Sequence, residues 1–413
     1  MLVVAANWGF TDGTLVRRPA AARAAREWLS RVGRAAIQSG FARDGAYRPP
    51  AAVDLVLAGD TFDCLLSAAW CGRDRPWHAG ARVAAARRRV LVDCARRAAP
   101  LVNGLLRLSK GGLTVPAADR RGRPDLSAVV RVAVRPVLVV GDRDLPLAEV
   151  AADVVTRGVA VAPAWGDGVV FVRHGHEFDP ACHVESVAAV ADRPPTLGES
   201  VAVDLVGRFA VELEAAGVPR SLGGSLLEAL AAAGVTEVSA LVAAWLRADA
   251  AAAAERMRCG VESAWRRAVD GWERETRRAP PDVGHAASPI ADLAAWFVGA
   301  DGPPPTLAHL LDRSPRCHGG ARTLVLGHAP GSRAEEGVIC LGRAAVPRWR
   351  PIVVVSADGA ASAACVEGSG SDEVPVTIAF QPRDEHPDWR QIAGAQWRDA
   401  IPASRLAAFV DAA

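Results

Sequence analysis

Short apolar runs that end next to a glycine and an aspartate or histidine recur along the chain. Runs of four to six apolar residues without polar alternation are typical of strands that are covered on both faces. We therefore predict a buried strand with polar side chains at its carboxyl end in each of four segments. These are DLVLAGDTFD at residues 54–63, PVLVVGDRDLP at 136–146, VVFVRHGHEFD at 169–179 and TLVLGHAPGS at 323–332.

Other apolar and polar patterns predict the elements between these strands. Further strands are expected at residues 2–5, 337–341, 351–356 and 361–366. Helical periodicity predicts two helices early in the chain, at residues 19–39 and 80–108. The stretch 109–125 is rich in Gly, Pro and Arg, so we expect an irregular excursion there.

Strand signals nearly disappear between residues 194 and 313, where apolar positions recur at helical intervals. Two sequences typical of helix starts, TLGE at 196–199 and SLLE at 225–228, lie in this block. Such a block between two groups of strands is expected of a helical insertion in one core. We predict a core at residues 1–185 and 316–366, an inserted helical cap at 186–315 and a C-terminal tail at 367–413.

Composition narrows the class of protein. Hydrophobic residues make up 50% of the 413 residues, yet no apolar stretch approaches the roughly 20 residues that a membrane-spanning helix needs. No charged segment precedes the first apolar run, so we expect no membrane span, no secretion signal and a cytoplasmic location. Eight cysteines without a C-x-x-C pair predict neither a zinc ribbon nor a disulfide framework. A net charge of +2 gives no strong signal for nucleic-acid binding.

The charged residues at the predicted strand ends are suited to binding a metal ion. Ligands of layered α/β proteins bind at the carboxyl ends of strands, where side chains from different strands meet. Two carboxylates and two imidazoles suit one divalent Mn, Fe or Zn ion with water in the remaining positions. The candidate ligands are Asp60, Asp142, His174 and His328.

Neighbouring polar residues are candidates for supporting roles. We expect Asp63, Asp144 and Asp179 to orient ligands as hydrogen-bond acceptors behind them, with a structural role in turns as the alternative. The segment HGHEFD offers several polar groups besides His174, and among them His176 is a candidate catalytic residue.

The ordered set GDTFD, GDRD, HGHEFD and GHAP resembles the motifs of the calcineurin-like metallophosphoesterases. Within that family, these motifs are most similar to those of the bacterial branch that includes UDP-2,3-diacylglucosamine hydrolase. The resemblance covers about residues 1–185 and 316–366. It implies an α/β (α+β) fold, a four-layer αββα sandwich with a helical insertion. It also implies two metal ions bridged by an aspartate, and a water that attacks phosphorus in line.

The sequence departs from the family pattern at one of these two metal sites. The family motif D-x-H falls on AANWGF, where Asn7 aligns with the aspartate and Gly9 with the histidine. In GHAP, Pro330 replaces the second histidine of G-H-x-H. The resemblance therefore implies that one site is lost, with Asn7 or Asp12 as a partial replacement ligand. The other site, formed by the four candidate ligands, is intact, so we expect one bound ion.

A further departure concerns catalysis. Arg143 occupies the position of the family's catalytic histidine. General-acid help of the kind that a histidine gives is worth about 10² to 10⁴ in rate, and arginine does not supply it at neutral pH. Its planar guanidinium is instead suited to holding a phosphate.

Two hypotheses follow for function. In the first, the chain is a divergent metallophosphoesterase that uses a metal-activated water to hydrolyse a phosphomonoester, phosphodiester or pyrophosphate. Its substrate would be a phosphorylated small molecule or a nucleotide-like compound selected by the helical cap. In the second, it is a catalytically dead pseudo-phosphoesterase, a binding or scaffold protein for a partner protein.

Overall fold

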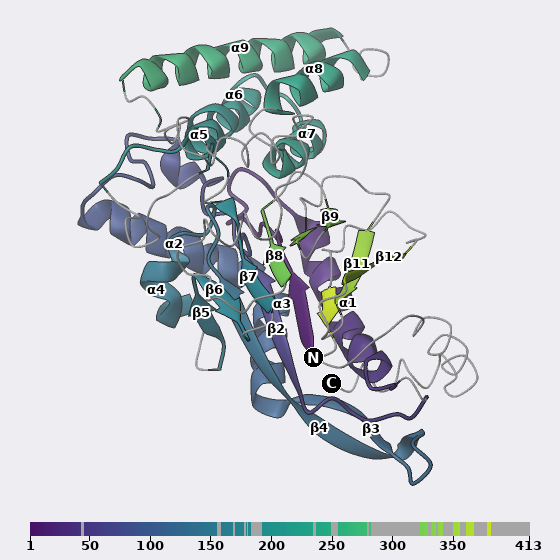
Figure 1. The fold of residues 1–413 in the computed structure, drawn as a ribbon. Coiled ribbons are helices and arrows are strands. Elements are labelled where there is room, and N and C mark those ends of the chain that lie inside the picture. The colour runs from purple at the N-terminus through teal and green to yellow at the C-terminus, as the bar shows by residue number, and fades with distance from the viewer. Residues whose placement is uncertain are drawn as a thin grey trace.

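The described residues of the computed structural model form two large β-sheets, a two-stranded sheet, helices against the first sheet and a helical cap (Figure 1). The residues that it describes are 1–42, 45–154, 158–167, 170–176, 179, 181–182, 192–233, 237–248, 255–278, 281, 323–328, 332–335, 338–341, 350–355, 361–366 and 378–380.

The first sheet has six strands in the order β13-β1-β2-β4-β3, with β5 also paired to β4. Strands β1, β2, β4 and β5 are parallel, and β3 and β13 are antiparallel to their neighbours. The parallel register brings the carboxyl ends of β2 and β4 to one edge of the sheet. The strands are β1 (Leu2–Ala5), β2 (Ala52–Ala58), β3 (Leu113–Ala118), β4 (Pro124–Val139), β5 (Ala160–Ala162) and β13 (Ile378–Phe380).

The second sheet has five strands in the order β6-β7-β8-β10-β9. Its strands β7, β8 and β10 are parallel, which brings the carboxyl ends of β7 and β8 side by side. Two more strands, β11 (Arg350–Val355) and β12 (Ala361–Val366), form an antiparallel pair. The five strands are β6 (Ala164–Gly166), β7 (Val170–Arg173), β8 (Thr323–Leu326), β9 (Ser332–Glu335) and β10 (Val338–Leu341).

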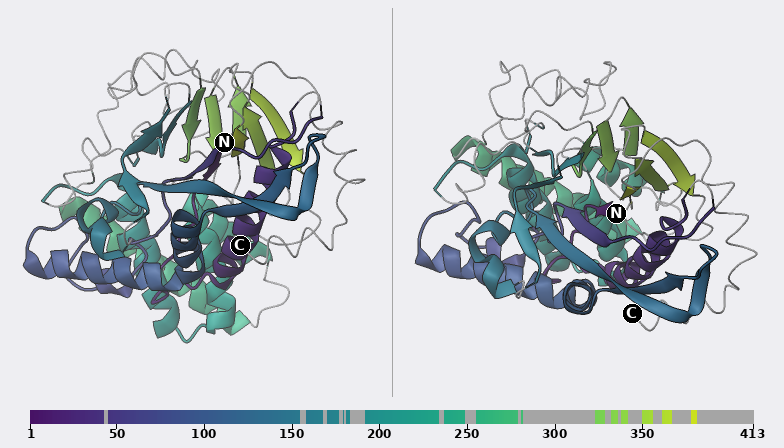
Figure 2. Two further views of the ribbon diagram at one scale, coloured as in Figure 1. Left: turned by 90° about the horizontal axis from the view of Figure 1, so that it is seen from below. Right: turned by 60° about the horizontal axis from the view of Figure 1, so that its bottom comes forward.

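Successive residues of the first sheet point to opposite faces, and both faces are buried. On one face, Leu55 and Leu57 join a large apolar cluster with Trp28 of α1 (Pro19–Gln38). On the other face, Val56 of β2 joins a second cluster with Val172 and Val325 of the second sheet. Figure 2 shows the green strands of the second sheet, β8, β9 and β10, across the first sheet from α1. The predicted α/β class is confirmed.

The helix predicted at residues 80–108 is two helices, α2 (Ala81–Arg97) and α3 (Ala99–Gly111). Pro100 lies in the first turn of α3. Proline has no N–H for the preceding turn and its ring clashes with that turn, so one continuous helix is excluded here. A short helix, α4 (Leu147–Val154), follows β4.

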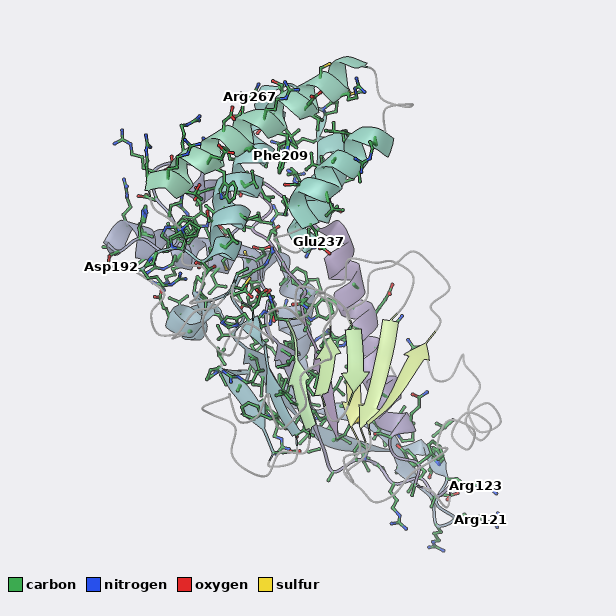
Figure 3. The ribbon with its side chains drawn as sticks, turned by 45° about the horizontal axis from the view of Figure 1, so that its top comes forward. Arg121, Arg123, Asp192, Phe209, Glu237 and Arg267 are labelled. Atoms are coloured by element: carbon green, nitrogen blue, oxygen red, sulfur yellow. The ribbon has the colours of Figure 1, made fainter. Side chains whose placement is uncertain are left out.

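The irregular excursion predicted at residues 109–125 is wrong, because β3 and the start of β4 form an antiparallel hairpin. Asp119 closes its turn by accepting the backbone N–H groups of Arg121 and Arg123 at 2.7 and 2.8 Å. Figure 3 shows these two arginines at the tip of the hairpin, far from the cap residues Phe209 and Arg267. Most side chains of β4 near the tip are exposed, among them Val129 and Val130, so this part of the strand extends beyond the core.

The predicted cap is helical in its described part. Its elements are α5 (Leu197–Ser200), a π-helical segment (Val201–Gly207), α6 (Arg208–Ala215), α7 (Arg220–Ala232), α8 (Val238–Ala248) and α9 (Glu255–Arg278). Thr196 and Glu199 form the predicted capping box at the start of α5. The second predicted box is wrong, since Ser225 lies inside α7, which begins after Pro219.

The cap packs directly on the core. Val201 and Leu230 of the cap share the large apolar cluster with Leu65 of the core. The guanidinium of Arg75 pairs with the carboxylate of Asp204 at 2.6 Å, and both side chains are largely buried. Within the described residues, no helix has the length and apolar character to cross a bilayer. Part of the predicted tail, β13, pairs with β1 at the edge of the first sheet.

Candidate metal centre

The ends of four strands bring together the four candidate metal ligands. Asp60 follows β2, Asp142 follows β4, His174 follows β7 and His328 follows β8. All four are buried, and each offers a ligand atom within 4.8 Å of the others. This buried Asp/His group can hold a metal ion. The parallel register within each sheet explains the convergence of residues far apart in the sequence.

Glycines beside the ligands allow the strand ends to approach closely. A Cβ at Gly59 would overlap the imidazole of His174, and one at Gly141 would overlap the carboxylate of Asp60. A Cβ at Gly327 would overlap the carbonyl oxygen of the last residue of β2. The glycines that precede Asp60, Asp142 and His328 are therefore required sterically by the close approach of the strand ends.

His174 lies between the two carboxylates. Its Nδ1 is 2.9 Å from the carbonyl oxygen of Ala58, which can only accept a hydrogen bond, so Nδ1 carries a proton. Its Nε2 is 2.9 Å from Oδ1 of Asp142 and 3.4 Å from Oδ2 of Asp60. Metal-binding histidines are commonly oriented in this way: one ring nitrogen donates to a backbone carbonyl, and the other faces the anionic groups of the site.

The cluster carries negative charge that a cation would neutralise. Burial and the charge of Asp142 raise the pKa of Asp60, but His174 and Arg143 outweigh both, and the pKa is lowered. Burial also raises the pKa of Asp142, yet hydrogen bonds from His174 and His328 hold it well below its ordinary value. Burial lowers the pKa of His174, but the two carboxylates raise it well above the usual range. Without a metal ion, the imidazolium of His174 thus balances part of the charge.

Asp179 contacts the fourth candidate ligand from behind. Its Oδ2 is 2.8 Å from Nε2 of His328, whose Nδ1 is 3.4 Å from Oδ1 of Asp142. This geometry makes Nδ1 the atom that faces the cluster while the carboxylate fixes the ring. His176 is also buried here, with its ring centroid 5.4 Å from that of His174.

Among the described residues, the side-chain hydrogen bonds of Asp144 and Asp63 are to backbone N–H groups of loops and to Arg143. None of these hydrogen bonds is to a ligand imidazole. Asp144 accepts the backbone N–H groups of Gly141 at 2.6 Å and Phe62 at 3.2 Å, which ties two ligand-bearing turns together. Burial and then the charge of Asp60 raise the pKa of Asp144 to about 7. Asp63 accepts two backbone N–H groups of its own turn through Oδ1. Both sets of contacts fit the structural role in turns.

Arg143 connects the core to the cap. Its Nη1 donates to Oδ2 of Asp63 at 2.7 Å and to the carbonyl oxygen of Ala231, near the end of α7, at 3.0 Å. Its backbone N–H donates to Oδ1 of Asp60 at 3.0 Å. Burial lowers the pKa of the guanidinium, but the surrounding carboxylates raise it further above its ordinary value. Arg143 is therefore a permanent cation beside the cluster.

The end of β1 contributes little that can bind a second ion. The Asn7 amide donates to the carbonyl oxygen of Gly327 at 2.7 Å, so Asn7 lies beside the His328 turn. A Cβ at Gly9 would overlap the guanidinium of Arg18, so a cation lies where the resemblance places the histidine, and the backbone there has a positive φ of 57°. Asp12 accepts hydrogen bonds from the hydroxyl groups of Thr14 and Ser67, at 2.6 and 2.5 Å, in a turn. Coordination by Asn7 stays a prediction.

A cavity lies between the cluster and the cap. Asp142 and Arg143 are the charged residues among those that line it, and the other lining residues are apolar or small. Val201, Ala202 and Leu230 contribute its cap side. A molecule in this cavity would thus meet a charged group only next to the cluster.

Sequence reasoning missed one residue of the site, Cys182. It is buried, and its Sγ lies within 4.8 Å of ligand atoms of Asp179 and His328. The only signal in the sequence was the short spacing of DPAC, residues 179–182, because His328 is far away along the chain.

Comparisons of the chain with protein-family models, with curated proteins and with solved structures found no match. The fold and the site together define an α/β protein with a parallel sheet, a helical cap and a buried Asp/His group that can hold a metal ion.

Proposed function

We propose that the chain is a divergent protein of the calcineurin-like metallophosphoesterase type that binds one divalent cation and hydrolyses a phosphoester. The observation that carries the proposal is the convergence of Asp60, Asp142, His174 and His328 from four strand ends. The resemblance of the surrounding motifs to that family supports the reaction class. The cation would be Mn, Fe or Zn, since carboxylate and imidazole ligands suit these ions.

The donor atoms fit a divalent cation. The two carboxylates are ionised and buried, and one nitrogen of each imidazole faces them. A cation held by these four residues would lower the pKa of a water molecule and polarise a phosphoryl oxygen. Asp179 would keep the ring of His328 in place, and the carbonyl of Ala58 would do the same for His174.

The residues around the cavity have roles in binding the substrate. Arg143 lies next to Asp142 on a small cavity, and its permanent positive charge would suit a phosphate group bound at the cluster. Arg143 cannot act as a general acid, because its pKa is far above neutrality. His176 is a buried titratable side chain beside His174, and we assign to it the transfer of a proton to the leaving group.

The architecture supports the same family. Two sheets share an apolar cluster, and helices cover the outer face of the first sheet, as three layers of an αββα sandwich would. The helical insertion covers the cavity and is the part that would select a phosphorylated small molecule or nucleotide-like substrate.

A second candidate function is that of a pseudo-phosphoesterase that binds a partner protein. Two contacts favour it. The guanidinium of Arg18 lies beside Gly9, so a positive charge stands at the position of the family's first histidine, where it disfavours a second cation. Arg143, at the position of the catalytic histidine, is already engaged by Asp63 and Ala231.

Metal analysis and hydrolysis of an aryl phosphodiester with added Mn²⁺ test the proposal. The wild-type chain should retain close to one ion and hydrolyse the ester, and His328→Ala should lose both. His78→Ala, which removes an exposed histidine outside the site, should keep both. Bound metal without hydrolysis would favour the pseudo-phosphoesterase. Equal metal content in His328→Ala and wild type would overturn the site.

A further inference from the structure

A second group of metal-ligating side chains lies directly behind the candidate metal centre. Asp179, Cys182 and His328 are all buried, and one ligand atom of each lies within 4.8 Å of the others. Only His328 belongs to both groups. Neither the two carboxylates of the first centre nor Arg143 takes part in this second group.

A single turn of the chain positions two of the three side chains. The backbone N–H of Cys182 donates to the carbonyl oxygen of Asp179 at 2.9 Å, which brings residues 179 and 182 to the same side of the turn. The N–H of Ala181 donates to Oδ1 of Asp179 at 2.9 Å. Oδ2 is therefore the carboxylate oxygen that faces the imidazole of His328, at 2.8 Å from Nε2.

The cap closes the remaining side of this group. A Cβ at Gly198, in the first turn of α5, would lie 2.7 Å from Sγ of Cys182. The N–H of Gly198 donates to the carbonyl oxygen of Ala181 at 2.6 Å, so the turn and the cap helix are joined. Cys182 and Gly198 also line the cavity that is lined by Asp142, so the two groups border one space.

We propose that Asp179, Cys182 and His328 form a second cation site, selective for a thiophilic ion such as Zn²⁺, Co²⁺ or Cd²⁺. One thiolate, one imidazole and one carboxylate match the three protein ligands of open zinc sites, which leave a fourth position to water or another ligand. The first centre has two carboxylates and no sulfur. Its ligands are therefore chemically harder than those of the second site and better suited to Mn²⁺.

His328 couples the two sites. A neutral imidazole has one nitrogen with a free electron pair, and the other nitrogen carries the proton. If Nε2 binds an ion at the second site, Nδ1 is protonated and no longer a ligand beside Asp142. A thiophilic ion at the second site would thus remove one of four ligands from the first. This competition concerns ion binding and holds whether or not the first centre hydrolyses a phosphoester.

Titration of the metal-free chain with Co²⁺ tests the second site. A thiolate that binds Co²⁺ gives a charge-transfer band in the near ultraviolet, and this band should appear in the wild-type chain. Cys182→Ser should lose the band, and Asp179→Asn should require more Co²⁺ to reach it. Cys64→Ser, which changes another buried cysteine, and Cys71→Ser, which changes an exposed one, should keep it. Far-ultraviolet circular dichroism checks that each variant is folded.

A competition experiment tests the coupling through His328. Free Mn²⁺ is measured by its electron paramagnetic resonance signal, with and without one equivalent of Zn²⁺. In the wild-type chain, Zn²⁺ should weaken Mn²⁺ binding by about 10- to 100-fold, the effect expected when a ligand loses its orientation. In Cys182→Ser, Zn²⁺ can act only by occupying the first centre itself, so saturating Mn²⁺ should release the Zn²⁺, whereas the wild-type chain should retain Zn²⁺ beside bound Mn²⁺.

The outcomes separate this proposal from the proposed function. A charge-transfer band that persists in a folded Cys182→Ser variant, or no band in the wild type, would overturn the second site. Release of Zn²⁺ by saturating Mn²⁺ from the wild-type chain, as from Cys182→Ser, would show that Zn²⁺ occupies the first centre and would overturn the coupling. Absence of phosphodiester hydrolysis would affect neither result, since both readouts report bound ions.

Discussion

Nε2 of His174 lies 2.9 Å from Oδ1 of Asp142, although the two residues end strands of different sheets. This contact joins the sheets at the edge where the other two candidate ligands also lie. In the metal-free chain, the carboxylates raise the pKa of His174 well above its ordinary value, so Nε2 carries a proton at neutral pH. A metal ion that binds at this nitrogen must displace that proton.

We therefore expect metal affinity to rise with pH. If one proton leaves His174 on binding, the apparent dissociation constant for Mn²⁺ should fall about tenfold per pH unit below the pKa of His174. Titration calorimetry in buffers of different ionisation enthalpy would measure both the affinity and the proton released. His176→Gln removes the neighbouring imidazole and should keep the dependence. Affinity that does not change with pH would show that His174 is not a ligand.

Much of this site was predictable from the sequence because each ligand follows an apolar run and a glycine. The strands Leu2–Ala5 and Thr323–Leu326 match their predicted limits, since strands covered on both faces consist of uninterrupted apolar residues. Parallel strands that end at one edge then bring the polar ends together, so the convergence of Asp60 and Asp142 follows from the strand pattern.

The parts that sequence analysis missed depend on contacts between distant segments. Strand β3 contains Pro116 and lies between Gly111-Gly112 and the arginine-rich turn, so the composition of residues 109–125 resembled that of a loop. Pairing of β13 with β1 depends on backbone hydrogen bonds, which leave little trace in side chains. Cys182 becomes a site residue only because His328 comes to lie beside it, and no local spacing predicts that contact.

The close approach at Gly141 leads to a second prediction. In Gly141→Ala, the new Cβ would overlap the carboxylate and backbone N–H of Asp60, so either the strand ends separate or Asp60 moves. We expect a loss of about 1–3 kcal/mol in the free energy of unfolding, together with loss of bound Mn²⁺. Urea unfolding and metal analysis measure the two effects. Gly72→Ala is the matched control, because no atom lies within 4 Å of its Cβ position. Normal metal content in Gly141→Ala would contradict the steric argument.

Asp144 makes the stability of the metal-free chain depend on pH. Its pKa is raised from 3.8 to about 7, so the folded chain binds this proton more tightly than the unfolded chain does. The free energy of unfolding should therefore decrease as the pH rises from about 4 to about 7, where the folded chain loses the proton. The lowered pKa values of Asp60 and Asp142 change the free energy of unfolding only below this pH range. The pKa of His174 is also raised, so His174 lowers the free energy of unfolding only at pH values above the ordinary pKa of histidine.

The variant Asp144→Asn isolates this contribution. It removes the titrating group, so the slope of stability against pH between about 4 and 6 should flatten relative to wild type. The amide accepts only one of the two N–H groups that Asp144 binds, so we also expect a pH-independent loss of about 1–3 kcal/mol. Urea unfolding in the presence of a chelator, across this pH range, gives both quantities. An unchanged slope would assign the dependence to another group.

The contact of Arg143 with Asp63 and Ala231 predicts that this side chain attaches the cap to the core. Asp63 is fully buried and Arg143 largely so, so removal of either partner leaves an uncompensated charge. Arg143→Met should lower the free energy of unfolding by about 3–5 kcal/mol and speed amide hydrogen exchange in α7.

A double-mutant cycle distinguishes this pairing from independent roles. The variant with both Asp63→Asn and Arg143→Met removes both charges, so it should be more stable than the sum of the single losses predicts, by about 1–3 kcal/mol. Arg220 and Glu214 provide a control pair in the cap, exposed and 2.8 Å apart, whose coupling should be less than about 1 kcal/mol. Additive losses at Asp63 and Arg143, with exchange in α7 unchanged, would mean that the cap is held by its apolar contacts alone.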